Sequence, residues 1–235
     1  EVGDPRVDYV RLDIADKEEA ISVLSDYDIV MDATTISLND ISTECIARAG
    51  CHGVNLNGFG EEAEIARLCE ELGATHSGAD LTDVAAIETM MADAGGIDIL
   101  VNNAGVGSSA NPNPVADFDD DFWDLTLKVN LTAPYLLSKA VLPDMLGKHW
   151  GRILTVASVN SRIGSFHGAA YAASKHGVLG LMRSLAMEVA GEGITVNAIC
   201  PGPVNTLMND KRIEYDAKRL GRDLVEHEKS LTPIG

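Results

Sequence analysis

The residues that decide the fold form the stretch Ser158-Val-Asn-Ser-Arg-Ile-Gly-Ser-Phe-His-Gly-Ala-Ala-Tyr171-Ala-Ala-Ser-Lys175. The hydrophobic run before it, Gly151-Arg-Ile-Leu-Thr-Val-Ala157, predicts a buried strand that ends at Ser158. From Tyr171 onward, residues recur at helical spacing, which predicts a helix to about residue 190. The stretch is therefore the end of a strand, a loop and the start of a helix.

Three side chains of this stretch suit proton transfer. Tyr171 and Lys175 are four residues apart, so on a helix they lie on the same face. A lysine ammonium favours the phenolate of a neighbouring tyrosine and lowers a phenol pKa that is otherwise about 10. With Ser158 at the end of the strand, the set predicts a tyrosine that acts as acid or base near neutral pH.

Each residue, taken singly, also has an ordinary structural interpretation. A tyrosine on the inner face of a helix is usually a core residue whose hydroxyl has a hydrogen-bond partner. Lys175 would then be a surface residue with a partly buried stem, and Ser158 would bond the backbone at a strand end.

Strands and helices alternate along the rest of the chain. Strands are expected over residues 7–13, 28–33, 53–57, 75–79, 97–101, 151–157 and 194–199. Helices are expected over residues 15–27, 39–49, 61–72, 83–94, 119–148 and 171–190, with a mostly helical tail after residue 205. This alternation predicts an α/β fold, a Rossmann-like doubly wound parallel sheet in three α/β/α layers. We expect a single domain over residues 1–235, with residues 1–27 as an extra N-terminal βα unit.

Charge and cysteine content exclude several classes of partner. The chain has 36 acidic and 18 basic residues, and its net charge of −18 repels nucleic acids and anionic membranes. No apolar run is long enough to span a bilayer. The four cysteines form no C-x-x-C pair and no His cluster lies beside them, which argues against a metal site and favours a reducing compartment. Without a signal-peptide pattern, we expect a cytoplasmic protein.

Polar or glycine-rich groups follow several predicted strands. In a doubly wound sheet, ligands bind at the carboxyl ends of the strands. The groups at those ends are Asn57, Asp80, Asn102 to Gly105, Ser158 and Pro201-Gly202. Their coincidence predicts a ligand site along this edge of the sheet.

From about Cys51 to Gly235, the chain resembles the short-chain dehydrogenase/reductase family. The matching residues occur in the family's order: Asp80-Leu81, Asn102-Asn-Ala-Gly105, Asn130, Ser158, Tyr171-x-x-x-Lys175, and Pro201-Gly202 with Thr206. Because six ordered matches are far more specific than one, we favour the catalytic interpretation. The resemblance implies NAD(P)-dependent hydride transfer between a small-molecule alcohol and a ketone or aldehyde.

The resemblance also assigns roles to individual residues. Tyr171 would be the general acid/base, Lys175 would lower its pKa and hold the nicotinamide ribose, and Ser158 would bond the substrate oxygen. Asn130 would hold a water in the proton relay, and Asp80 would bond the adenine amine. The implied cofactor-binding residues are Asn57, Phe59, Asp80, Leu81, Asn103, Ala104, Gly105, Tyr171, Lys175, Pro201, Gly202, Val204 and Thr206.

The end of the strand expected over residues 53–57, which is the second strand of the family's fold, bears on the choice of cofactor. An acidic residue there usually binds the ribose hydroxyls, whereas a nearby arginine accommodates the 2′-phosphate of NADP. The stretch Asn57-Gly-Phe-Gly-Glu-Glu62 has no basic residue, which favours NAD without excluding NADP. The overlapping stretch Val54-Asn-Leu-Asn-Gly-Phe-Gly60 also resembles that of D-3-hydroxybutyrate dehydrogenases, although sugar and polyol dehydrogenases share the other motifs.

The phosphate loop departs from the family's pattern. A glycine-rich loop should follow the first strand, yet Ala33, Ser37 and Asn39 stand where its glycines belong. Those glycines let the backbone approach a pyrophosphate closely, which a Cβ atom hinders. The altered loop supports a second hypothesis, a catalytically silent Rossmann-type scaffold or binding protein.

Both ends of the chain are unusual for this family. Residues 1–50 are more similar to a saccharopine-dehydrogenase-type Rossmann segment, through Asp28-Ile-Val-Met-Asp-Ala-Thr34 and Ala47-Arg-Ala-Gly-Cys-His-Gly-Val-Asn-Leu56. Residues 28–235 resemble the family but stop where it continues into another helix and strand. We therefore expect a chimera, a fragment or a divergent member.

Family resemblance further implies a homo-oligomer, a dimer or homotetramer, formed through the helices that begin near Asp119 and Tyr171. Apolar positions of the second helix, Leu179, Met182 and Leu185, suit either such an interface or the core. The substrate depends on residues 106–117, on residues 159–168 and on the tail after residue 206. His167, four residues before Tyr171, faces either the substrate or solvent in this interpretation.

Overall fold

The computed structural model of the chain describes residues 29–33, 53–58, 62–203 and 206–231. Its strands form one sheet in the order β3-β2-β1-β4-β5-β6, and every neighbouring pair is parallel. The strands are β1 (Ile29–Ala33), β2 (Gly53–Asn57), β3 (Thr75–Ser77), β4 (Ile99–Asn102), β5 (Gly151–Val156) and β6 (Ile194–Ile199). The predicted doubly wound sheet is confirmed, whereas the elements predicted over residues 7–27 and 39–49 lie outside the described residues.

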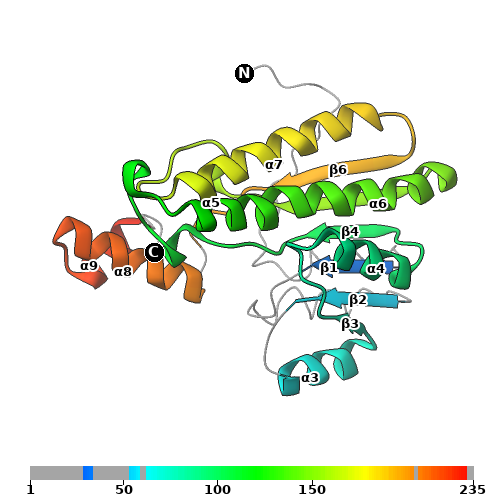
Figure 1. Cartoon of the computed structure of the whole chain (residues 1–235), viewed down its shortest axis with the longest axis horizontal. Coiled ribbons are helices and arrows are strands. Elements are labelled where there is room, and N and C mark those ends of the chain that lie inside the picture. The colour runs from blue at the N-terminus through cyan, green and yellow to red at the C-terminus, as the bar shows by residue number, and fades with distance from the viewer. Residues whose placement is uncertain (1–28, 34–52, 59–61, 204–205, 232–235) are drawn as a thin grey trace.

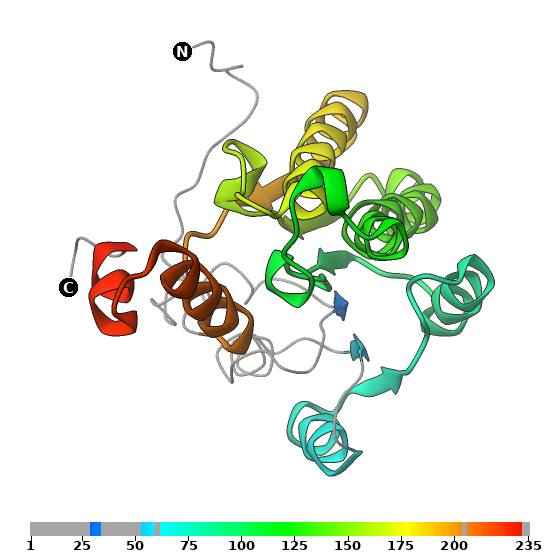
Figure 2. The same cartoon turned by 60° about the vertical axis from the view of Figure 1, so that its left-hand side comes forward.

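Helices cover the sheet and extend beyond one end of it (Figure 1). They are α3 (Glu62–Leu72), α4 (Val84–Ala94), α5 (Asp120–Leu127), α6 (Ala133–Lys148), α7 (Ala169–Glu188), α8 (Leu207–Leu220) and α9 (Leu224–Leu231). Figure 2 shows α4, α6 and α7 in a row along one side of the sheet. Two of the predicted starts are fixed by aspartate caps: Asp83 accepts the Ala85 N–H, and Asp119 accepts the N–H groups of Asp121 and Phe122.

The main core lies between the sheet and these three helices. Leu100 and Ile153 of the central strands pack with Leu137 and Met145 of α6 and with Met182 of α7, and all are buried. Close packing of large aliphatic side chains on both layers holds the helices against the sheet. A smaller cluster on the other face contains Val54, Leu56 and Ile99.

The burial of the apolar residues of α7 bears on whether they belong to the core or to an interface. Leu179, Met182 and Leu185 are 8%, 2% and 6% exposed within the single chain, and the last two belong to the main core. They are therefore core residues, which is one of the two interpretations that the sequence left open.

The helix predicted over residues 119–148 is interrupted. A π-helical segment, Lys128–Thr132, separates α5 from α6, and the Ala133 N–H bonds the Lys128 carbonyl five residues earlier. Pro134 has no N–H to donate to the Asn130 carbonyl four residues before it, so the regular α pattern is broken there. Such π segments often occur at functional sites, and this one contains Asn130.

All strands of the sheet point toward the end of the molecule at which α8 and α9 lie (Figure 1). Because α7 begins at Ala169, two residues earlier than predicted, Tyr171 lies in its first turn. Among the described helices, none combines the length and hydrophobicity needed to cross a bilayer.

The turn between α7 and β6 generates a stability prediction. Gly193 has a φ of +75°, and a Cβ there would lie 1.9 Å from the carbonyl oxygen of His149 at the end of α6. We expect Gly193→Ala to lower the free energy of unfolding by about 3 kcal/mol or more, because a left-handed conformation and a backbone clash add together. Gly191→Ala is the matched control in urea unfolding, because Gly191 has a φ of +96° and nothing within 4 Å. Equal losses in the two variants would contradict the clash.

Candidate active site

The predicted catalytic residues come together at the carboxyl ends of β4 and β5. Ser158 follows β5, Tyr171 and Lys175 lie on the first turns of α7, and Asn130 lies in the π-helical segment. Gly105, after β4, lies against two of them: an added Cβ would be 3.4 Å from Asn130 Oδ1 and 3.7 Å from Lys175 Nζ. Segments that are far apart in the sequence therefore form one site.

Asn130 joins three of these segments through its side chain. Its Oδ1 accepts the Val106 N–H at 2.7 Å, and its Nδ2 donates to the Val106 carbonyl at 2.9 Å and to Ser174 Oγ at 3.1 Å. The side chain is 1% exposed, so these bonds form in a low-dielectric interior where they are strong. Asn130 thus fixes the loop after β4 against α7. Its role in holding a relay water stays a prediction.

Ser158 and Tyr171 form the centre of the site. The Ser158 N–H donates to Ser161 Oγ at 3.2 Å, and Ser158 Oγ accepts the Asn160 N–H at 3.1 Å, which fixes the serine at the strand end. Burial raises the pKa of Tyr171 above its ordinary value, and a weaker hydrogen bond with the Ser158 side chain lowers it. Desolvation thus outweighs the lowering effect of Ser158, and the expectation that Lys175 lowers the Tyr171 pKa stays a prediction.

Lys175 is a buried cation beside the tyrosine. Its Nζ donates to the Val156 carbonyl at 2.8 Å and lies 5.7 Å from the centre of the Tyr171 ring. Burial lowers the pKa of Lys175 to about 8, against a smaller raising effect of Cys200. The ammonium can therefore favour a Tyr171 phenolate only at a pH below roughly that value.

Residues predicted for the adenosine end of the cofactor lie along the β2–β3 edge. The Asn57 Nδ2 donates to the carbonyls of Ser77 and Ala79, both at 3.0 Å, so its side chain braces two strands and is 1% exposed. The Asp80 carboxylate is exposed and accepts the Thr82 N–H at 2.8 Å, a bond that lowers the pKa of Asp80. Leu81 is buried in the main core.

The remaining predicted cofactor residues line the loops after β4 and β6. Asn103 and Gly105 are partly exposed, Ala104 packs on the main core, and the Pro201 carbonyl accepts the Val159 N–H at 2.9 Å. Gly202 is exposed, and Thr206 caps α8 by accepting the Asn209 N–H at 3.3 Å. Outside the described residues lie Phe59, Val204, Ser37 and Asn39, whereas Ala33 is the last residue of β1.

The residues present fit a nicotinamide dinucleotide. Asn102, at the end of β4 and in register with Ala33 of β1, donates from Nδ2 to Thr155 Oγ1 at 3.2 Å. Its Oδ1 is buried and has no hydrogen-bond partner among the described residues, so it is a polar group that a ligand or water can satisfy. Gly105 provides a surface without a side chain beside the Asn130 amide oxygen and the Lys175 ammonium. Small groups and hydrogen-bonding atoms therefore line the strand ends where a dinucleotide binds.

Sequence reasoning missed two residues that support the site. Ser174 is fully buried, accepts a hydrogen bond from Asn130 Nδ2 and donates to the Tyr171 carbonyl at 2.8 Å. Ser161 closes a reciprocal capping box with Ser158. The position of Ser174 next to Lys175 was a usable signal, whereas the loop geometry at Ser161 could not be read from the sequence.

Comparisons with known proteins agree with this geometry. A family model described as short chain dehydrogenase matches residues 41–217, so the match begins within the segment that resembles saccharopine-type proteins. The chain is 39% identical over 197 residues to D-beta-hydroxybutyrate dehydrogenase of Cupriavidus necator, covering 79% of the chain and 75% of that protein. It is 40% identical over 160 residues to the 3-oxoacyl-acyl-carrier-protein reductase of Escherichia coli, covering 66% and 64%.

A solved structure shares the fold. The crystal structure of a phenylalanine-to-tryptophan variant of actinorhodin polyketide ketoreductase with NADPH superposes with a TM-score of 0.78 and 31% sequence identity. The likeness covers 89% of this chain and 83% of that chain.

Burial of Lys175 makes the stability of the cofactor-free chain depend on pH. The folded chain releases the Lys175 proton at a pKa of about 8, whereas 10.5 is the ordinary value that the unfolded chain keeps. Between these two pKa values, the unfolded state binds more protons than the folded state. The free-energy cost of burying the ammonium is therefore present in full below the lower pKa, and it disappears as the pH rises toward the higher pKa. The unfolding free energy of Lys175→Met relative to the native chain should therefore fall by about 2 to 3 kcal/mol between pH 7 and pH 10, on top of a pH-independent cost of leaving the Val156 carbonyl without its donor. Urea unfolding measures this, and a difference that does not vary with pH would contradict it.

Proposed function

Because the chain belongs to the short chain dehydrogenase family and is an NAD(P)-dependent oxidoreductase acting on CH–OH groups, we propose that Tyr171 is its general acid/base. The observation that carries the proposal is the side-chain interaction of Ser158 that lowers the Tyr171 pKa, together with the Lys175 ammonium 5.7 Å from the centre of the same ring. A phenol, a hydroxyl and a buried cation suit a proton transfer at one substrate oxygen.

In the proposed mechanism, the protein moves the proton and orients the reactants. A bound nicotinamide cofactor supplies the chemistry of hydride transfer. Ser158 Oγ hydrogen-bonds the substrate oxygen, and Tyr171 takes the proton from the alcohol or returns it to the carbonyl. Lys175 favours the phenolate through its charge while the Val156 carbonyl holds it in place. Asn130 keeps the loop after β4 against α7, so that the groups meet in one geometry.

A catalytically silent scaffold is the alternative suggested by the altered phosphate loop. It is not favoured, because relatives that align with most of the chain are named as dehydrogenases and reductases. The described part of the site also brings all four predicted catalytic residues together, a costly arrangement to maintain around a buried, partly neutralised lysine.

We also propose that the substrate carries its oxygen on the carbon beta to a carbonyl group. The relatives support this, because D-beta-hydroxybutyrate and a 3-oxoacyl group share that arrangement.

A homo-oligomer and a cytoplasmic location remain part of the proposal. The free thiols of Cys69 and Cys200 support a reducing compartment, and the exposed Leu125 of α5 and Leu146 of α6 offer apolar surface for a second copy.

For the cofactor, we propose a preference for NAD over NADP. Neither residues 32–42 nor residues 57–62 contain a lysine or arginine that would neutralise a 2′-phosphate. We expect NADH to bind at least about tenfold more tightly than NADPH, a difference of one charge-assisted contact. Quenching of protein fluorescence in titrations of both cofactors measures the ratio, and tighter binding of NADPH would overturn the preference.

The role of Tyr171 has a direct test. We expect Tyr171→Phe to lower kcat at least about a hundredfold, because it removes the proton donor and leaves the ring in place. NAD-linked oxidation of secondary alcohols that include 3-hydroxy acids provides the measurement, and NADH titration checks that cofactor binding is retained. Tyr135→Phe, on the exposed face of α6, is the matched control. Activity of Tyr171→Phe equal to that of the control would refute the assignment.

A further inference from the structure

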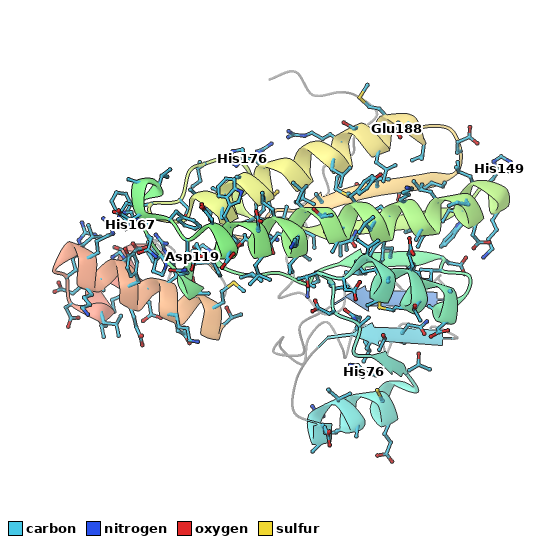
Figure 3. The ribbon with its side chains drawn as sticks, viewed as in Figure 1. His76, Asp119, His149, His167, His176 and Glu188 are labelled. Carbon is cyan, nitrogen blue, oxygen red and sulfur yellow. The ribbon has the colours of Figure 1, made fainter. Side chains whose placement is uncertain are left out.

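The loop just before Tyr171 is held by helix α8, at the end of the fold where His167 lies (Figure 3). Arg212 of α8 donates from Nη2 to the Phe166 carbonyl at 2.7 Å. His167 Nδ1 lies 2.5 Å from the hydroxyl of Tyr215, one turn further along the same helix. Neither expectation for His167, substrate or solvent, describes this contact. Two consecutive loop residues are therefore fixed to one face of α8.

Arg212 is itself held in a fixed orientation. Its Nε and Nη2 donate to the two carboxylate oxygens of Asp216 at 2.7 and 3.2 Å, and both side chains are only 18% exposed. A bidentate pair of this kind fixes the plane of the guanidinium as well as its position. Because the guanidinium plane is fixed, the N–H of Nη2 that points away from Asp216 is directed at the Phe166 carbonyl.

The loop conformation needs this external support. His167 has a φ of +54°, a left-handed conformation that costs free energy for a residue with a side chain. Such a conformation persists when surrounding contacts over-determine it. Contacts from α8 include the Tyr215 hydroxyl on His167 and the Arg212 guanidinium on the preceding carbonyl, and Arg219 lies 4.0 Å from the Phe166 ring centre. Within the loop, the Gly168 N–H donates to the Ser165 carbonyl at 3.1 Å.

The supported residues lead directly into the first turn of α7. Gly168 precedes the helix, and its carbonyl accepts the Ala172 N–H at 2.9 Å, so the loop forms part of the turn that carries Tyr171. Gly168 is also tightly packed, since an added Cβ would lie 2.9 Å from Ser108 Cβ. A shift of the Phe166 carbonyl would therefore be transmitted to Tyr171, because the chain between them has little free space.

We propose that Arg212, oriented by Asp216, is a positioning residue that places the Tyr171 hydroxyl against Ser158 by holding the Phe166 carbonyl. The inference rests on the proposed role of Tyr171. Helix α8 also contacts the loop after β4, where Ser109 Oγ donates to the Met208 carbonyl at 3.0 Å. Helix α8 thus contacts both loops that border the catalytic residues.

The test compares Arg212→Ala with Lys211→Ala, an exposed neighbour on the same helix. We expect kcat of Arg212→Ala to fall between about tenfold and a hundredfold, the usual effect of misplacing a reacting group. NADH affinity and the thermal unfolding midpoint should stay close to those of the control. Added guanidinium ion should restore part of the activity, whereas Arg212→Lys should remain impaired because lysine lacks the planar fork.

A second variant keeps the proposal testable if Arg212→Ala folds poorly. Tyr215→Phe removes only the hydroxyl that bonds His167. The Ser158 hydrogen bond lowers the pKa of Tyr171, so weaker placement of Tyr171 should move the rise of kcat/KM with pH to higher pH. A change confined to stability would not move this profile.

The outcomes separate this inference from the proposed function. An inactive Tyr171→Phe together with a normal kcat and pH profile in both α8 variants would overturn the positioning role alone. An active Tyr171→Phe would overturn the proposed function itself. A loss of kcat in Arg212→Ala that is fully explained by weaker NADH binding would also count against the positioning role.

Discussion

The site depends on the hydrogen bonds of one buried amide, the side chain of Asn130. It accepts the Val106 N–H, donates to the Val106 carbonyl and donates to Ser174. These bonds connect the loop after β4, the interrupted helix and α7. The amide reaches those partners from a π-helical segment, because Pro134 prevents a regular α turn there. A local irregularity in a helix thus fixes the distance between the strand ends and the helix that carries Tyr171 and Lys175.

Within that frame, burial and charge act against each other. Desolvation raises the pKa of Tyr171 and lowers that of Lys175, so the protein alone favours the neutral form of each group. The Val156 carbonyl and the Ser158 hydroxyl oppose this through hydrogen bonds. A site with a buried cation beside a buried phenol is therefore sensitive to any further charge that enters it. This sensitivity suits a reaction in which charge changes at the substrate and cofactor.

Patterns of local origin could be predicted from the sequence, and contacts between distant segments could not. The strand before Ser158 and the helices that begin near Asp83, Asp119 and Tyr171 follow from hydrophobic periodicity and helix-start signals. Hydrophobic periodicity could not show that the helix is interrupted at Asn130, because a π turn shifts the pattern of apolar residues by only one position. It also could not assign Leu179 and Leu185 to the core, because an inner and an outer apolar stripe look alike until the partner layer is known. The direction in which the Tyr171 pKa is shifted depends on how deeply the side chain is buried, which only the fold reveals.

The supports of Tyr171 differ in how they couple to the rest of the molecule. Asn130 and Lys175 belong to elements that share the main core, so their positions are fixed by close packing. The loop from Phe166 to Gly168 instead relies on contacts with α8, in which Ile213 and Ala217 are the buried apolar residues among the side chains that the structure describes. Polar contacts at a partly exposed helix are easier to break than a packed core. The proton-transfer group is therefore held on one side by a closely packed layer and on the other by polar contacts with a partly exposed helix.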